Sequence, residues 1–167
     1  MQRALLVIDI QNDYFAGGEL ELFAADETAE RIKAAILDAR QAGDRVVLVQ
    51  HVSTAPKGMF ASGSAGVAIR PDILEAADGV PVVVKHVADA FQDTDLATHL
   101  DGIDSLLVCG MMTQNCVVFT AMSAHAQGYN VSVVEDLCTA PTEVVHTIAL
   151  SALKSKLNVQ TSRALWT

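Results

Sequence analysis

Residues 3–10 read RALLVIDI, an aliphatic and β-branched run that is interrupted near its end by Asp9. A short continuous apolar run of this kind is typical of a strand that is buried on both faces. Residues 26–42 follow with the periodicity of a helix, for which Asp26 is the expected N-cap and Gly43 the expected stop. A buried strand followed by an amphipathic helix is the first half of a βαβ unit.

The same alternation continues to the end of the chain. Further strands are expected at residues 45–51, 81–85, 105–109, 130–134 and 159–161, and further helices at 71–77, 94–100, 114–127 and 142–156. No linker or repeat interrupts this pattern, so residues 1–167 are expected to form a single domain. The order predicts an α/β fold, a three-layer, doubly wound, Rossmann-like arrangement with a mainly parallel sheet of about six strands.

Composition narrows the function classes. The formal net charge is −9 and the pI is about 4.8, which argues against binding to nucleic acids or anionic membranes, because both require basic surfaces. No apolar stretch approaches the length of a membrane span. The three cysteines, Cys109, Cys116 and Cys138, are odd in number and widely spaced. They indicate reduced thiols and a cytoplasmic location rather than a disulfide framework or a zinc site.

Three reactive groups lie at or just after the ends of predicted strands: Asp9, Lys85 and Cys116. The carboxyl ends of parallel strands meet at one edge of the sheet, where ligands bind in folds of this class. A lone Asp or Lys at a strand end is also common as a loop cap or as a charge that emerges into water. The three groups together predict a site at this edge.

Cys116 lies in residues 110–117, GMMTQNCV, at a strand-to-helix turn. In the first turn of a helix, the dipole and free N–H groups favour a thiolate and can bind an oxyanion. The alternative for any single cysteine is inert burial, which we expect for Cys109 and Cys138.

Three segments together resemble a known family. They are residues 6–15, LVIDIQNDYF, residues 85–91, KHVADAF, and residues 110–117. The chain resembles the isochorismatase-like cysteine hydrolases over nearly its whole length. That superfamily includes nicotinamidases and N-carbamoylsarcosine amidohydrolase. The resemblance implies an isochorismatase-like hydrolase fold and a small-molecule substrate.

The resemblance also implies a mechanism. Asp9, Lys85 and Cys116 would form a catalytic triad that hydrolyses a small amide, ureide or carbamoyl compound through a thioester. A cis peptide bond is expected between Met112 and Thr113, and the N–H groups of Thr113 and Cys116 would form the oxyanion hole. Assembly as a homodimer or larger oligomer is implied as well, with residues 117–122 as a candidate contact.

The segment after the second predicted strand departs from the nicotinamidase pattern. Nicotinamidases carry a metal site there, built from an Asp and two His. Here residues 50–56 read QHVSTAP, with one histidine and no carboxylate. We therefore expect no catalytic metal and no cofactor, and nicotinamide is a doubtful substrate.

Substrate contacts are expected from side chains near the predicted edge. The glycine-rich residues 52–70 are expected to form a loop over the site. Ordinary core packing is the alternative for the aromatic residues, and capping of the second strand is the alternative for His51. For Gln11 the alternative is a hydrogen bond that orients the loop or Asp9. His146 is expected to be structural. The candidate pocket residues are Gln11, Phe15, His51, Phe60 and Phe91.

Two other functions stay open. The first is isochorismatase-type hydrolysis of a vinyl ether, which relatives perform with the aspartate and without a thiol. The second is a catalytically silent binding protein on the same fold. A nucleotide-binding role is disfavoured, because residues 10–13 read IQND and contain no glycine-rich phosphate loop.

Overall fold

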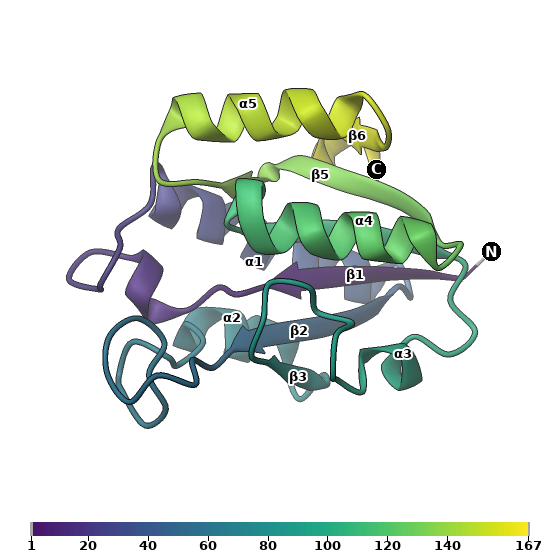
Figure 1. The fold of residues 1–167 in the computed structure, drawn as a ribbon. Coiled ribbons are helices and arrows are strands. Elements are labelled where there is room, and N and C mark those ends of the chain that lie inside the picture. Colours follow the sequence, from purple (N-terminus) through teal and green to yellow (C-terminus); the bar gives the residue numbers. More distant parts are fainter. Residues whose placement is uncertain (1, 167) are drawn as a thin grey trace.

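The computed structural model describes residues 2–166 and contains a six-stranded, all-parallel sheet (Figure 1). The strand order is β3-β2-β1-β4-β5-β6, so the direction of winding reverses between β1 and β4. The strands are β1 (Arg3–Ile8), β2 (Arg45–His51), β3 (Val82–Lys85), β4 (Ser105–Met111), β5 (Asn130–Thr139) and β6 (Asn158–Gln160). The predicted fold class is confirmed.

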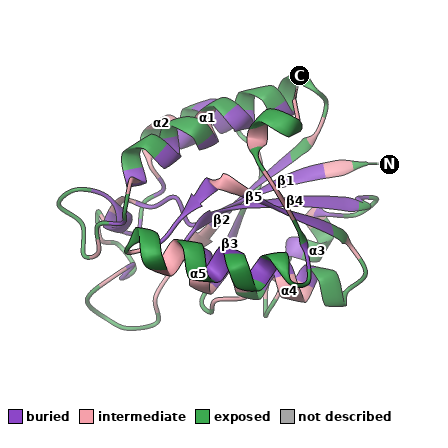
Figure 2. Ribbon diagram, turned by 90° about the horizontal axis from the view of Figure 1, so that it is seen from above, coloured by how far each residue is buried: buried purple, intermediate pink, exposed green. Residues whose placement is uncertain are grey.

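Helices cover both faces of the sheet, so the molecule has three layers. Figure 2 shows α1 and α2 on one side of the strands and α4 and α5 on the other. The helices are α1 (Ala25–Gln41), α2 (Pro71–Ala77), α3 (Leu96–His99), α4 (Val118–Ala126) and α5 (Glu143–Lys154). Among the described residues, no helix is long and apolar enough to cross a membrane.

The core lies between these layers, and β1 runs through its centre. The side chains of residues 4–8 are at most 1% exposed. Both faces of this strand are covered, which explains why its sequence is apolar throughout rather than alternating.

The helix starts differ from those expected. α1 begins at Ala25 behind a left-handed Ala24 that makes no side-chain cap. Asp26 is therefore not the N-cap, because it already lies within the helix and its carboxylate pairs with Arg70 at 2.5 Å. At α5, by contrast, Thr142 is the N-cap and accepts a hydrogen bond from the Val145 N–H.

Strands β4 and β5 run further than the sequence indicated. They stay paired after an irregularity in register, with Gly110 opposite Cys138 and Met111 opposite Thr139. The predicted helix at residues 114–127 is also divided. Its first part is a π-helical turn, Thr113–Val117, and α4 starts only at Val118. Both differences lie where β4 passes into the turn that carries Cys116.

Candidate active site

Asp9, Lys85 and Cys116 lie together at the carboxyl edge of the sheet. Asp9 directly follows β1, Lys85 is the last residue of β3, and Cys116 is in the π-helical turn after β4. The Lys85 Nζ atom is 2.9 Å from Asp9 Oδ2 and 3.2 Å from Cys116 Sγ. The side chains of Asp9 and Lys85 are fully buried and Cys116 is 3% exposed. The expected convergence is therefore present.

The sheet sets this arrangement through backbone turns and register. The Asp9 N–H still donates to the Val49 carbonyl of β2 at 3.0 Å. The backbone of Asp9 is left-handed (φ 55°), so β1 ends and the chain turns at this residue. His51 and Lys85 are direct partners in the β2–β3 ladder. Paired residues in a parallel ladder project to the same face, which places the His51 ring beside the Lys85 ammonium.

The Lys85 ammonium has four acceptors around it. Besides Asp9 and Cys116, its Nζ atom contacts His51 Nδ1 at 2.9 Å and the Val87 carbonyl oxygen at 3.1 Å. An ammonium has three N–H donors, which match the hydrogen bonds to His51, Val87 and Cys116, while Asp9 is the ion-pair partner. Lys85 is thus held as a buried cation between the two groups that are candidates for base and nucleophile.

Asp9, His51 and Cys116 each carry an atom of a kind that can ligate a metal ion. Their candidate ligand atoms all lie within 4.8 Å of one another. However, the Lys85 ammonium contacts all three, at 2.9 to 3.2 Å, and so fills the place that a metal ion would take. The residues present therefore do not fit a metal ion at this position.

Burial and neighbouring charges control the protonation of the pair formed by Asp9 and Cys116. Burial raises the pKa of Asp9, and the Lys85 charge opposes this only in part. Burial and the Asp9 charge together raise the pKa of Cys116 to about 12. At neutral pH the thiol therefore keeps its proton in the resting state. The raised pKa of Asp9 makes this carboxylate a better acceptor for that proton.

A cis peptide bond is present near Cys116, but not where it was expected. It joins Met111 to Met112, one residue before the predicted bond between Met112 and Thr113. β4 extends to Met111, so the chain leaves the strand and enters the turn at that residue. An oxyanion hole formed by the N–H groups of Thr113 and Cys116 stays a prediction.

His146 is a residue whose contact the sequence did not reveal. Its Nδ1 atom lies 2.7 Å from the buried Thr113 Oγ1, so α5 supports the turn that carries Cys116. The two residues are 33 positions apart. No local pattern connects them, and only the packing of α5 on this turn brings them together.

Gln11 connects the segment after β1 to the end of β2. Its Oε1 accepts a hydrogen bond from the His51 N–H at 2.8 Å, and its Nε2 donates to the His51 carbonyl at 2.8 Å. Nε2 also donates to the Val67 carbonyl at 2.7 Å, and the side chain is fully buried. These hydrogen bonds give Gln11 the orienting role that was the alternative for it, and substrate contact by this side chain stays a prediction.

The three candidate aromatic residues lie in different parts of the structure. Phe60 lies at the site, with its ring 5.6 Å from the His51 ring. Phe15 is buried under the Arg70 guanidinium, 4.3 Å from its ring centroid. Phe91 packs 5.9 Å from Tyr129, which precedes β5 at the opposite edge of the sheet. Phe91 is therefore not placed to line the pocket, because its segment runs back along the molecule.

The loop at residues 52–70 is tied to the segment after β1. The Asp13 carboxylate accepts a hydrogen bond from the Phe60 N–H at 2.6 Å, and the Asp13 N–H donates to the Gly66 carbonyl at 3.0 Å. A Cβ at Gly66 would lie 2.0 Å from Asp13 Oδ1, so the backbone approaches Asp13 closely. Asp13 thus fixes Phe60 against the site.

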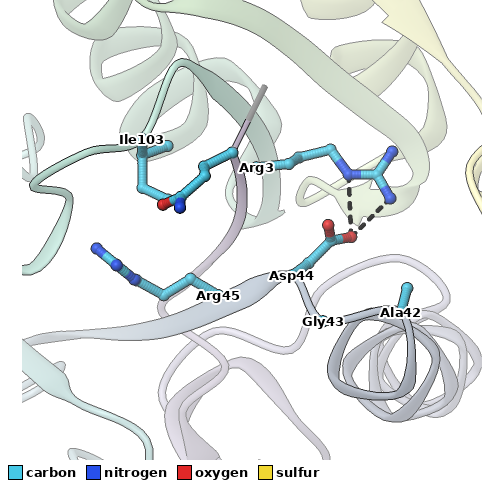
Figure 3. A pocket seen from close by; sticks show the side chains of 7 residues that line it. Arg3, Ala42, Gly43, Asp44, Arg45 and Ile103 are labelled. Carbon is cyan, nitrogen blue, oxygen red and sulfur yellow. Dashed lines mark hydrogen bonds and ion pairs between the residues drawn. The ribbon is translucent and has the colours of Figure 1, made fainter.

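A large surface hollow lies at the other end of the sheet. Figure 3 shows Arg3 directed at Asp44, with which it makes a double contact at 2.6 and 2.9 Å. The hollow, of about 450 Å³, also includes Arg45, whose guanidinium donates to the backbone carbonyls of His99 and Asp101. Its basic groups already have partners, so this hollow is not the candidate active site.

The stability of the protein should depend on pH through His51. Burial, Lys85 and His86 lower the pKa of His51 from 6.5 to about 4. Between these values the unfolded chain binds more protons at His51 than the folded chain does. The free energy of unfolding should therefore fall as pH falls, and the full effect is reached below about pH 4.

His51→Asn should remove this part of the acid sensitivity. Because His51 is partly exposed, we expect wild type to lose roughly 1–2 kcal/mol more than His51→Asn between pH 7 and 4. Urea unfolding at several pH values measures the difference. Parallel curves for the two proteins would contradict the expectation.

Comparison with known proteins gives the family. A model of the isochorismatase domain matches residues 3–164. The chain is also 36% identical over 166 residues to YddQ, an uncharacterized isochorismatase family protein of Bacillus subtilis, and the match covers 92% of each chain. The chain belongs to the isochorismatase family. The resemblance that the three sequence segments indicated is thereby confirmed.

Other members of the isochorismatase family extend this comparison. A nicotinamidase of Escherichia coli is 29% identical over 175 residues, with 81% of this chain and 82% of that protein covered. The crystal structure of a putative isochorismatase hydrolase from Oleispira antarctica superimposes with a TM-score of 0.91 at 34% identity. That match covers 98% of this chain and 95% of the other. The family is hydrolytic and includes an amidase.

Proposed function

We propose that this isochorismatase-family protein hydrolyses a small amide, ureide or carbamoyl compound through a thioester on Cys116. The observation that carries the proposal is the bridging position of the Lys85 ammonium, 2.9 Å from Asp9 and 3.2 Å from Cys116. A buried carboxylate, a cation and a thiol in contact are the parts that an activated nucleophile needs. The amidase among the relatives supports the bond class.

The first half-reaction forms the thioester. Asp9 takes the proton of the Cys116 thiol, and Lys85 stays protonated and stabilises the thiolate. The thiolate attacks the carbonyl carbon, so that a C–S bond forms and the carbonyl oxygen becomes negative. The N–H groups of Thr113 and Cys116 would stabilise this oxyanion. The C–N bond then breaks, and the amine leaves with the proton from Asp9.

The second half-reaction releases the acid. Asp9, again a carboxylate, takes a proton from water, and the resulting hydroxide attacks the thioester carbonyl. The C–S bond breaks, and the sulfur regains a proton from Asp9. The starting state is restored, with one water consumed and with no cofactor required.

The principal alternative is hydrolysis of the isochorismate vinyl ether. Protonation by Asp9 would be sufficient for that reaction, and no step would use the thiol. The contact between Lys85 and Cys116 favours the thioester route, because it has a role only if the sulfur becomes negative. Release of pyruvate from isochorismate by wild type and equally by Cys116→Ser would support the alternative instead.

The thioester proposal is tested by mapping thiol reactivity. Cys116 and Cys138 are both 3% exposed, and burial raises the pKa of both to about 12. Cys138 is therefore a matched control within the same molecule. We expect iodoacetamide near pH 7 to label Cys116 at least about tenfold faster, because only Cys116 has Asp9 and Lys85 as neighbours.

Mass spectrometry of the digested protein locates the label. The preference for Cys116 should disappear in Lys85→Met, because Lys85 is the neighbour that lowers the pKa of the thiol. Substrate screening over small amides, ureides and carbamoyl compounds follows, with Cys116→Ser as the inactive control. Equal, slow labelling of the three cysteines in wild type would count against the proposal and favour a catalytically silent binding protein.

Self-association and a cytoplasmic location are further parts of the proposal. Within the expected contact at residues 117–122, Val117 and Ala121 are fully buried and Phe119 is 55% exposed. In α5, the apolar side chains of Val144 (67%) and Ile148 (64%) are exposed as well. We therefore propose that a homodimer or larger oligomer would use α4 and α5 together. Sedimentation of wild type and Ile148→Lys tests this.

A further inference from the structure

His51 contacts the catalytic lysine directly. Its Nδ1 atom is 2.9 Å from Lys85 Nζ, and the two residues are register partners at the ends of β2 and β3. The sheet itself therefore sets the contact, which does not depend on a flexible loop.

The protonation state of His51 follows from its neighbour. The Lys85 ammonium can only donate, so Nδ1 must be the acceptor and the ring proton lies on Nε2. Burial and the Lys85 charge both favour the neutral ring by lowering its pKa. His51 is thus a neutral acceptor that binds the cation without adding a charge that would compete for the proton of Cys116.

Contacts with Gln11 and Phe60 hold the His51 ring in place. Gln11 pairs with both backbone groups of His51, at 2.8 Å each, and Phe60 packs on the ring with centroids 5.6 Å apart. Phe60 is in turn fixed by its hydrogen bond to Asp13. The imidazole is therefore constrained from the backbone and from one ring face before any substrate binds.

Proton transfer changes the acceptors of Lys85 unequally. When the S–H bond of Cys116 breaks and an O–H bond forms on Asp9, the negative charge moves from oxygen to sulfur. Asp9 then binds the ammonium less strongly. Two of the four acceptors keep their character through this step, His51 Nδ1 and the Val87 carbonyl oxygen at 3.1 Å.

We propose that His51 is a positioning residue that keeps the Lys85 ammonium beside the Cys116 thiolate while Asp9 carries the proton. This inference rests on the proposed function, because it assigns His51 a part in forming the thiolate. His51 itself gains and loses no proton. The groups that can influence the titration of this cluster are Asp9, Asp13, Tyr14, Lys85, His86 and Cys116.

A reciprocal pair of variants separates the acceptor from the ring. His51→Asn keeps an acceptor oxygen near the position of Nδ1 and loses the ring that packs on Phe60. His51→Phe keeps a ring of similar shape and loses the acceptor. His125→Leu, at an exposed position of α4, controls for the loss of a histidine elsewhere.

The readout is the rate of iodoacetamide labelling at Cys116 divided by that at Cys138, in the full chain from pH 5 to 9. General loosening of the fold would speed both cysteines, so the ratio reports the local environment. We expect His51→Asn and His125→Leu to stay within about threefold of wild type near pH 7. His51→Phe should lower the ratio by about tenfold or more, as a rise of one unit in the pKa of the thiolate requires, and recover only at higher pH.

The outcomes distinguish a failure of the proposed function from a failure of the inference about His51 alone. If wild type shows no preference for Cys116, the proposed function fails. If wild type shows the preference and His51→Phe keeps it, or if His51→Asn loses it as completely as His51→Phe, the inference about His51 fails alone. Should His51→Phe not fold, as judged by thermal unfolding, His51→Leu supplies the acceptor-free variant in its place.

Discussion

Replacing Lys85 with methionine should remove activity and most of the stability of the protein together. Lys85 and Asp9 are both fully buried and 2.9 Å apart. Removing the cation leaves the Asp9 charge without its partner, which typically costs about 3–5 kcal/mol. The Cys116 thiolate also loses its stabilising charge. A loss of about 4 kcal/mol in the transition state would slow turnover by roughly 10³-fold.

The double variant Asp9→Asn/Lys85→Met separates these two effects. It replaces the ion pair with neutral side chains, a change that is often close to neutral for stability. We expect the double variant to recover most of the unfolding free energy that Lys85→Met loses. Iodoacetamide should label Cys116 no faster in the double variant than in Lys85→Met. Urea unfolding measures the first quantity and iodoacetamide labelling measures the second. A stable, reactive Lys85→Met protein would contradict the role given to the ammonium.

Among substitutions of glycine by alanine, Gly110→Ala should be the most destabilising, because of its backbone conformation and its contacts. Gly110 has φ 123° and lies in β4 beside β1. A Cβ atom there would be 2.1 Å from the Ile8 carbonyl oxygen and 2.7 Å from the Ile8 nitrogen. These are backbone atoms of the central strand and cannot move aside. We expect a loss of more than about 4 kcal/mol, a large part of the stability of a typical domain.

Gly43→Ala is the matched control for Gly110→Ala. Gly43 also has a positive φ, 81°, but a Cβ added there would meet nothing within 4 Å. Its replacement should cost only the left-handed backbone penalty, about 1–2 kcal/mol. Thermal unfolding of the two variants therefore isolates the steric contribution at Gly110. Equal losses for both would show that conformation, rather than the close approach to Ile8, controls the effect.

The local patterns were sufficient for the elements with clear ends. Residues 45–51 and 71–77 were predicted with the bounds that the structure has, because a β-branched run and a proline-initiated helix are both short-range signals. The end of β5 was not predictable in the same way. Its continuation to Thr139 depends on pairing with Met111, a contact between strands that are distant in the sequence.

In the candidate site, too, some residues could be predicted from the sequence and others could not. Asp9, Lys85 and Cys116 could be selected from the sequence, since each lies at or after a strand end and parallel strands end at one edge. Phe91 follows β3 as well, yet it packs on Tyr129 at the other edge. A residue in a loop is not positioned by strand direction, so its place depends on the path of the chain.

The sequence by itself indicated the alternating parallel fold and the three reactive groups, because hydrophobic period and strand ends are local properties. The resemblance of three segments indicated the family. Only the tertiary structure decided which acceptors surround Lys85. His51 and Lys85 lie 34 positions apart, and His146 and Thr113 lie 33 apart. A shift of one residue in strand register would turn His51 to the opposite face of the sheet. Such contacts depend on how the strands and helices pack together, which no single segment encodes.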